Sequence, residues 1–67
     1  MKAYRIYMID PDGRLQLGQA FEAPDDQAAA ERAIGAATKG RIAELWEGGR
    51  VVGRVTETGL FEPGRGA

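Results

Sequence analysis

Two pairs of short apolar stretches, each pair joined by a turn signal, flank an alanine-rich stretch in the middle of the chain. Residues 3–9 (Ala-Tyr-Arg-Ile-Tyr-Met-Ile) are rich in aromatic and β-branched side chains, which favours a strand. Asp10-Pro11-Asp12-Gly13 follows, and proline and glycine at these places are typical of a hairpin turn. Residues 15–22 then predict the returning strand, with Gly18 as a candidate for a β-bulge.

The middle of the chain predicts one helix. Asp25 is the expected N-cap, and it and Asp26 suit the positive end of the helix dipole. We expect the helix to run from Asp26 to about Thr38, with Lys39 at its C-terminal end and Gly40 as its left-handed cap. Its apolar stripe is nearly all alanine, so the helix can approach a sheet closely but covers little area.

A second hairpin is predicted after the helix. Residues 41–47 indicate a third strand, Gly48-Gly49 is the signal for a two-residue turn, and residues 50–55 indicate the returning strand. Residues 56–67 contain turn formers and no apolar period. They are therefore interpreted as a mobile C-terminal tail, with Leu60 and Phe61 as its candidate anchors.

These elements follow one another in the order ββαββ, which indicates the α+β class. We expect a four-stranded antiparallel sheet of order 2-1-3-4, because this order makes every neighbouring pair antiparallel. The single alanine-rich helix would then pack across one face. Residues 1–55 are expected to form one domain.

If Asp10 pairs with Arg14, one face of the first hairpin holds Ala3, Tyr7, Ile9, Leu15, Leu17 and Phe21, with Ala3 opposite Phe21. The Gly48-Gly49 turn pairs Glu47 with Arg50, Trp46 with Val51 and Leu45 with Val52, and we expect Glu47 and Arg50 to form a cross-strand pair. One face of the second hairpin then holds Ile42, Trp46, Val51 and Val55.

Both faces of both predicted hairpins are apolar, although one helix can cover only one face. The uncovered face requires cover from the tail, a protein partner or a second copy, unless a bulge at Gly18 changes the register. We favour a second copy, because only about 18 side chains are both apolar and larger than alanine. The residues predicted to form the contact are Tyr4, Ile6, Met8, Trp46 and Val51.

Composition excludes several kinds of chemistry. The 67 residues include no Cys, His, Ser or Asn, so the usual nucleophile–base pairs and zinc sites with sulfur or nitrogen ligands cannot be built. No catalytic residue, cofactor or metal ligand is therefore nominated, and a non-enzymatic domain is expected. The chain has no apolar run long enough to span a membrane, and its start lacks the apolar stretch of a secretory signal. A cytoplasmic location without membrane contact is the expectation.

The charge balance disfavours general binding to nucleic acid. Nine basic residues face ten acidic ones, for a net charge of −1, whereas a binder of the phosphate backbone is normally basic. One alternative remains open, in which exposed aromatic side chains and arginines form a base-stacking sheet surface. The arginines of this alternative are Arg5, Arg41, Arg50 and Arg54.

Three segments carry a resemblance to known sequences: 4–7 with 10–14, then Asp25-Asp26-Gln27-Ala28-Ala29, then Ala43-Glu44-Leu45-Trp46-Glu47-Gly48. Together they resemble a group of short bacterial proteins, common in alphaproteobacteria, that has no assigned activity. The match covers roughly residues 4–55, and it transfers no functional residue. A fainter similarity links the hairpin and the acidic-capped helix to antitoxin partners of the HicB type, which implies a regulatory partner as a further alternative. This chain departs from that type by its second hairpin and by its lack of a DNA-binding segment.

The sequence thus leads to one principal hypothesis: a small protein-interaction domain that forms a homodimer through an apolar sheet face. An unidentified protein partner is the alternative occupant of that face.

Overall fold

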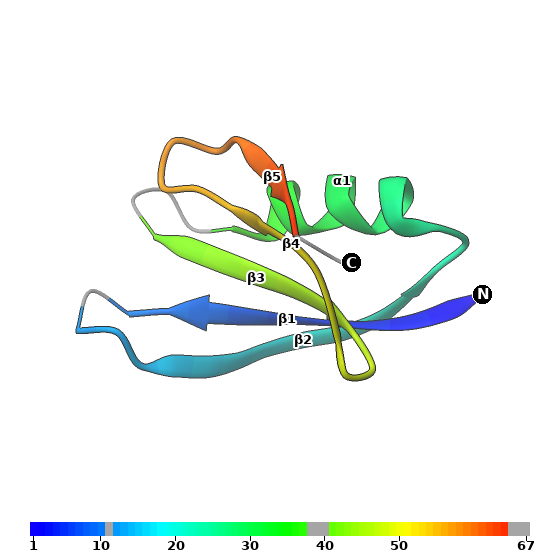
Figure 1. Ribbon diagram of the computed structural model, residues 1–67, viewed down its shortest axis with the longest axis horizontal. Helices are drawn as coiled ribbons and strands as arrows, with labels where there is room; N and C mark the ends of the chain where they lie inside the picture. The colour runs from blue at the N-terminus through cyan, green and yellow to red at the C-terminus, as the bar shows by residue number, and fades with distance from the viewer. Residues whose placement is uncertain (11, 38–40, 65–67) are drawn as a thin grey trace.

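A computed structural model describes residues 1–10, 12–37 and 41–64. These residues form an antiparallel sheet of five strands with one helix across one of its faces (Figure 1). The strand order is β2-β1-β3-β4-β5. The elements in chain order are β1 (Lys2–Ile9), β2 (Leu15–Ala23), α1 (Asp26–Ala36), β3 (Ile42–Glu47), β4 (Arg50–Val55) and β5 (Phe61–Pro63).

The α+β class and the relative order of the first four strands are confirmed. The prediction of a four-stranded sheet is wrong by one strand, because a fifth strand, β5, pairs with β4. The interpretation of the segment after Val55 as a tail without regular structure is therefore wrong for residues 56–64, while 65–67 lie outside the described residues. A turn between Thr56 and Leu60 reverses the chain, and the backbone N–H of Thr56 donates to the Leu60 carbonyl at 2.7 Å. Of the two predicted anchors, Phe61 packs against the core and Leu60 is 67% exposed.

The start of α1 agrees with the prediction. The Asp25 side chain accepts a hydrogen bond from the backbone N–H of Ala28 at 2.8 Å, so Asp25 is the N-cap. The helix ends at Ala36, two residues before the predicted end, and the N–H of Ala37 closes it on the Ala33 carbonyl. The predicted roles of Thr38, Lys39 and Gly40 lie outside the described residues.

A β-bulge in β2 changes the register of the first hairpin. Ile9 faces Leu15 and Tyr7 faces Leu17, as predicted, but Arg5 then faces Ala20 and Tyr4 faces Phe21. The expected pairing of Ala3 with Phe21 is wrong, because Gly18 and Gln19 together oppose Ile6. A Cβ atom on Gly18 would lie 2.5 Å from the Ile6 carbonyl oxygen, so only glycine fits this close approach. The bulge moves Phe21 to the face that α1 covers.

A second β-bulge, in β4, changes the register of the second hairpin. Glu47 faces Arg50 and Trp46 faces Val51, as predicted, but Leu45 then faces Gly53 instead of Val52. Val52 is the extra residue, and Val55 consequently shares a face with Ala43. Val55 is fully buried. The hypothesis that Val55 lies on the same face as Trp46 is therefore wrong.

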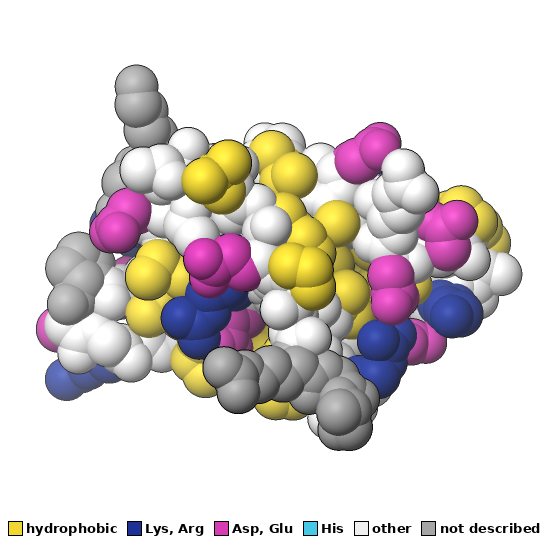
Figure 2. Space-filling view, turned by 45° about the horizontal axis from the view of Figure 1, so that its top comes forward, with side chains coloured by type: hydrophobic (Ala, Val, Ile, Leu, Met, Phe, Trp, Pro, Cys, Tyr) yellow, Lys and Arg dark blue, Asp and Glu magenta, His cyan; other side chains and the backbone are white. Residues whose placement is uncertain are grey.

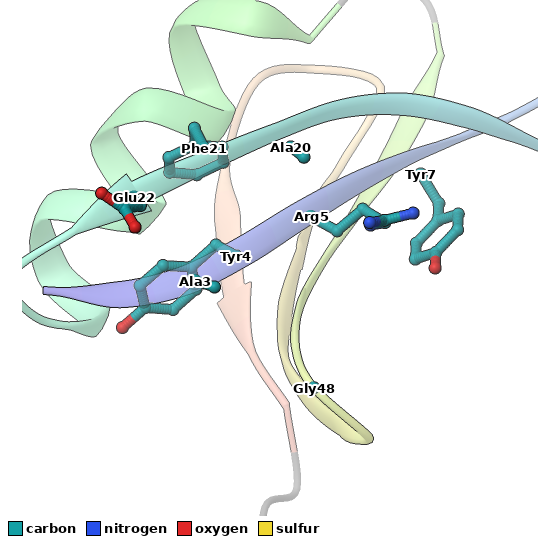
Figure 3. A pocket seen from close by; sticks show the side chains of 8 residues that line it. All are labelled: Ala3, Tyr4, Arg5, Tyr7, Ala20, Phe21, Glu22 and Gly48. Atoms are coloured by element: carbon teal, nitrogen blue, oxygen red, sulfur yellow. The ribbon is translucent and has the colours of Figure 1, made fainter.

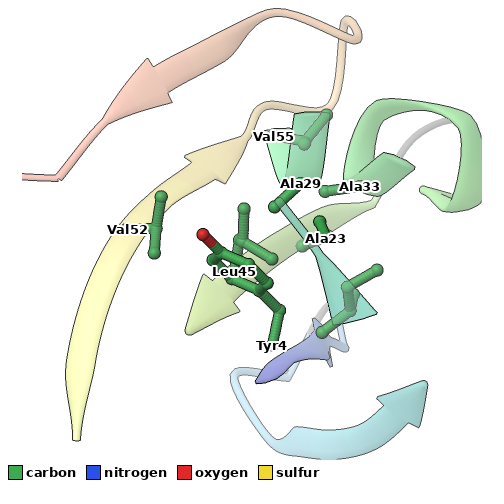
Figure 4. Close-up of a cluster of buried hydrophobic side chains, with 9 residues drawn as sticks. Tyr4, Ala23, Ala29, Ala33, Leu45, Val52 and Val55 are labelled. Atoms are coloured by element: carbon green, nitrogen blue, oxygen red, sulfur yellow. The ribbon is translucent and has the colours of Figure 1, made fainter. Parts of the chain in front are cut away.

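The core lies between α1 and the sheet (Figure 4). Its largest fully buried side chains are Ile6, Leu45 and Val55, and the helix contributes Ala29 and Ala33, both with no exposed surface. Alanine at these two positions lets the helix approach the strands closely, as the sequence predicts. The Tyr4 ring stacks on Phe21 with a centroid separation of 5.7 Å, which extends the core toward β2.

Candidate interaction surface

The sheet face opposite α1 has no helix over it in the part of the chain that the structure describes, and we call it the open face. Its position follows from the strand ladders, since residues that pair directly across antiparallel strands point to the same side. Arg5 pairs with Trp46, and Ile9 pairs with Ile42. The large apolar side chains described on the open face are Tyr7, Ile9, Leu15, Ile42, Trp46 and Val51. Leu15 is 57% exposed, and the other five side chains are half-buried.

An aromatic pair joins β1 and β3 on the open face. The rings of Tyr7 and Trp46 meet edge to face, with centroids 6.1 Å apart and an interplanar angle of 82°. The indole Nε1–H of Trp46 donates to Glu44 Oε1 at 3.1 Å. The other oxygen of the same carboxylate, Oε2, accepts from Arg54 at 3.2 Å. The Trp46 indole, the Glu44 carboxylate and the Arg54 guanidinium are thus partnered with one another within the chain.

A shallow hollow of about 560 Å³ extends this surface toward the β3–β4 turn (Figure 3). Arg5 and Tyr7, two residues apart on β1, line it from the open face, and Gly48 of the turn lies at its border. Glu22 contributes a charge opposite to that of Arg5. The hollow therefore combines apolar side chains with one charge of each sign.

A polar network lies near the start of α1. Tyr4 Oη donates to Asp26 Oδ1 at 2.8 Å, and Arg50 donates to both oxygens of Asp26 at 3.0 and 3.2 Å. Arg50 also forms the predicted cross-strand ion pair with Glu47. The hydrogen bonds from Arg50 and Tyr4 hold the pKa of Asp26 below its ordinary value of 3.8. Burial and the Asp26 carboxylate raise the pKa of Tyr4 to about 12. This network ties the helix to β1 and β4.

The five residues predicted to form a contact do not lie on one face. Tyr4 and Ile6 are 2% and 1% exposed in the core, and Met8 packs against the same cluster beneath α1. Trp46 and Val51 lie on the open face. The five therefore cannot form a single contact surface, since Tyr4 and Ile6 are already buried within the chain.

Sequence reasoning joined the wrong faces of the two hairpins. It correctly placed Tyr7, Ile9 and Leu15 on one face of the first hairpin, and Ile42 with Trp46 on one face of the second. The β1–β3 register decides that these two faces are continuous. Glu44 was missed, although its place two residues before Trp46 on one strand is a signal that the two share a face.

The four arginines of the nucleic-acid alternative do not gather into one basic patch. Arg41 pairs with Asp10 at 3.1 Å, and Arg54 pairs with Glu44. Arg50 is held by Asp26 and Glu47. Among the described residues, no carboxylate lies within ion-pair distance of Arg5. Figure 2 shows charges of both signs between apolar side chains on the face that it presents.

Residues 1–10, 12–37 and 41–64 contain no group of three or more acidic side chains that would hold a metal ion. No helix among them is long and apolar enough to cross a membrane. No protein-family model matches the chain, and no curated protein or solved structure matches it either.

Proposed function

We propose that this chain is a small, non-enzymatic protein-interaction domain that self-associates through the open face. The observation that carries the proposal is the arrangement of Trp46, Glu44 and Arg54. Burying a polar group without a hydrogen-bond partner costs about 1–3 kcal/mol. Because Glu44 already accepts from both Trp46 and Arg54, a partner can cover the aromatic pair without leaving these three groups unpaired.

The size of the open face supports a stable contact. Four strands of six to nine residues cover roughly 19 × 25 Å, or about 480 Å² of flat area, at the usual spacings of strands and residues. Side-chain relief makes the accessible area larger than the flat area. The accessible area of the open face is therefore of the same order as the roughly 800 Å² that each partner buries in an interface of standard size.

The charges on the open face suit a second copy of the same chain. Arg5 and Arg54 lie on this face together with Glu22, Glu44 and Glu62. A face with both signs of charge can pair with its own copy about a two-fold axis without uniform repulsion. A nucleic acid would instead require a predominance of positive charge.

The test is sedimentation equilibrium over a wide concentration range with the wild type and Trp46→Glu. We expect the wild type to reach a mass of about 14 kDa or more, at least twice the chain mass of 7.2 kDa, and Trp46→Glu to have a lower mass than the wild type at equal concentration. Leu60→Glu is the matched control, because it places the same charge at an apolar residue that is 67% exposed in a turn. It should associate as the wild type does.

Two results would contradict the proposal. One is a wild-type mass near 7 kDa at every concentration. The other is a Trp46→Glu variant that keeps its fold, as shown by circular dichroism, and associates as strongly as the wild type.

A further inference from the structure

The two edges of the sheet differ in how they are protected. An edge strand exposes unpaired backbone N–H and C=O groups, and proteins usually protect it by short length, charge or proline. The edge strand β5 has all three: it contains only three residues, and these include Glu62 and Pro63. The opposite edge strand, β2, has nine residues, and among the described strands it pairs only with β1.

The strand β2 lacks most of these protective features. From Leu15 to Phe21 it contains no charged residue and no proline. Its bulge at Gly18 is accommodated against the Ile6 carbonyl of β1. The bulge divides the free edge into stretches on either side of Gly18 and Gln19, so a contact along this edge would be short. A short ladder predicts a weaker contact than the open face provides.

Charges at the two ends of β2 indicate what fits the edge. Arg14 directly precedes the strand and Glu22 lies near its end, and both residues are exposed. Arg14 has only a loose ion pair with Asp12, at 3.8 Å, in which both side chains are mostly exposed. When two copies of β2 run antiparallel, the Arg14 end of each strand meets the Glu22 end of the other. A parallel arrangement would bring like charges together.

We propose that the free edge of β2 pairs antiparallel with β2 of a second copy, with Arg14 of each chain near Glu22 of its partner. A two-fold axis perpendicular to the sheet relates the copies, so both helices lie on one side and the two open faces form one continuous surface. The resulting sheet has ten strands. Together with the open-face contact, this edge contact gives an assembly of four chains, in which two such sheets pack face to face.

The experiment is sedimentation equilibrium of the full chain and three variants: Arg14→Glu, Glu22→Arg and the double swap. Each single variant turns two attractive pairs into repulsive ones. We expect the concentration at half-maximal edge association to rise about fivefold or more. The double swap restores the opposite charges in exchanged positions, so its association should return toward the wild type. Glu57→Arg, a charge reversal at an exposed residue remote from β2 in the sequence, is the control.

Amide hydrogen exchange provides a second readout that does not depend on charge. Pairing of the edge protects outward-facing amides between Leu15 and Glu22, so their exchange should slow as the protein concentration rises. The same amides should exchange faster in Arg14→Glu at equal concentration.

The outcomes separate this proposal from the open-face proposal. A wild type that approaches about 29 kDa, four times the chain mass of 7.2 kDa, supports both contacts. Association that Trp46→Glu abolishes and Arg14→Glu leaves unchanged would overturn the edge contact alone. Association that Arg14→Glu abolishes and Trp46→Glu leaves unchanged would overturn the open-face contact and uphold the edge contact. A double swap that associates as poorly as the single variants also contradicts the edge pairing.

Discussion

The two faces of the sheet are both apolar, yet they differ in how completely the chain covers them. On the α1 side, Ile6, Leu45 and Val55 are at most 1% exposed. On the open face, Tyr7 and Trp46 are half-buried, and Leu15 is 57% exposed. Two bulges account for part of this difference, since they move Phe21 and Val55 from the open side to the covered side. The apolar residues that remain on the open face are there despite the bulges, which is why we assign them to a contact.

The largest expected effect concerns the covered face. Ile6 and Ile9 are the same residue type on one strand, with Ile6 1% exposed under α1 and Ile9 half-buried on the open face. Ile6→Ala should lower the free energy of unfolding by about 2–5 kcal/mol, because it leaves a cavity in the core. Ile9→Ala should cost about 1 kcal/mol in dilute solution. Urea unfolding at low protein concentration measures both, and equal losses would contradict the distinction between the faces.

The next effect concerns the first bulge. Gly18→Ala places a Cβ atom 2.5 Å from the Ile6 carbonyl oxygen, so β1 and β2 must separate or shift register. We expect a loss of about 1–3 kcal/mol in the free energy of unfolding. Gly35→Ala is the control, since a Cβ atom there meets nothing within 4 Å and alanine favours a helix by about 1 kcal/mol. If Gly18→Ala is as stable as the wild type, the bulge at Gly18 does not place Phe21 on the covered face.

The smallest effect concerns the network that joins α1 to the sheet. The pKa of Asp26 is lower in the folded chain than its ordinary value of 3.8, because Arg50 and Tyr4 donate hydrogen bonds to the carboxylate. Ionised Asp26 therefore stabilises the fold above pH 3.8, and this contribution is lost as the pH falls through the lower folded value. Asp26→Asn should cost about 0.5–1 kcal/mol at pH 7, since these groups are partly exposed.

Urea unfolding between pH 2 and pH 7 provides the measurement for Asp26→Asn. The loss of stability below pH 3.8 should be shallower in this variant than in the wild type. Asp12→Asn is the control, because Asp12 is exposed and contacts Arg14 only loosely. Parallel pH profiles for the wild type and Asp26→Asn would contradict the role of the network.

Local sequence signals predicted the elements well. The hydrogen bond from the Gly13 N–H to the Asp10 carbonyl, the N-cap at Asp25 and the Gly48-Gly49 turn each act over a few residues, and each lies where it was expected. The predicted role of Pro11 lies outside the described residues. The order of the first four strands followed from the same elements, because antiparallel neighbours restrict the choices.

Register and the last strand were harder to predict, because they depend on contacts between distant residues. Gly18 was recognised as a candidate bulge, but its consequence for Phe21 depends on a close approach to Ile6. Next to the bulge at Val52, a Cβ atom on Gly53 would clash with Phe61 and the Glu62 carbonyl of β5, a strand that local composition did not indicate. The continuity of the two hairpins on the open face likewise depends on the β1–β3 ladder.

Acrylamide quenching of Trp46 fluorescence across a dilution series tests the open-face contact most directly. The chain has one tryptophan, and it lies on this face, so the fluorescence signal reports on the open face. If a second copy covers the face, the quenching constant should be low at high protein concentration and should rise on dilution as the emission shifts to longer wavelength. A quenching constant that is the same at every concentration would contradict the assignment of the open face as a self-association surface.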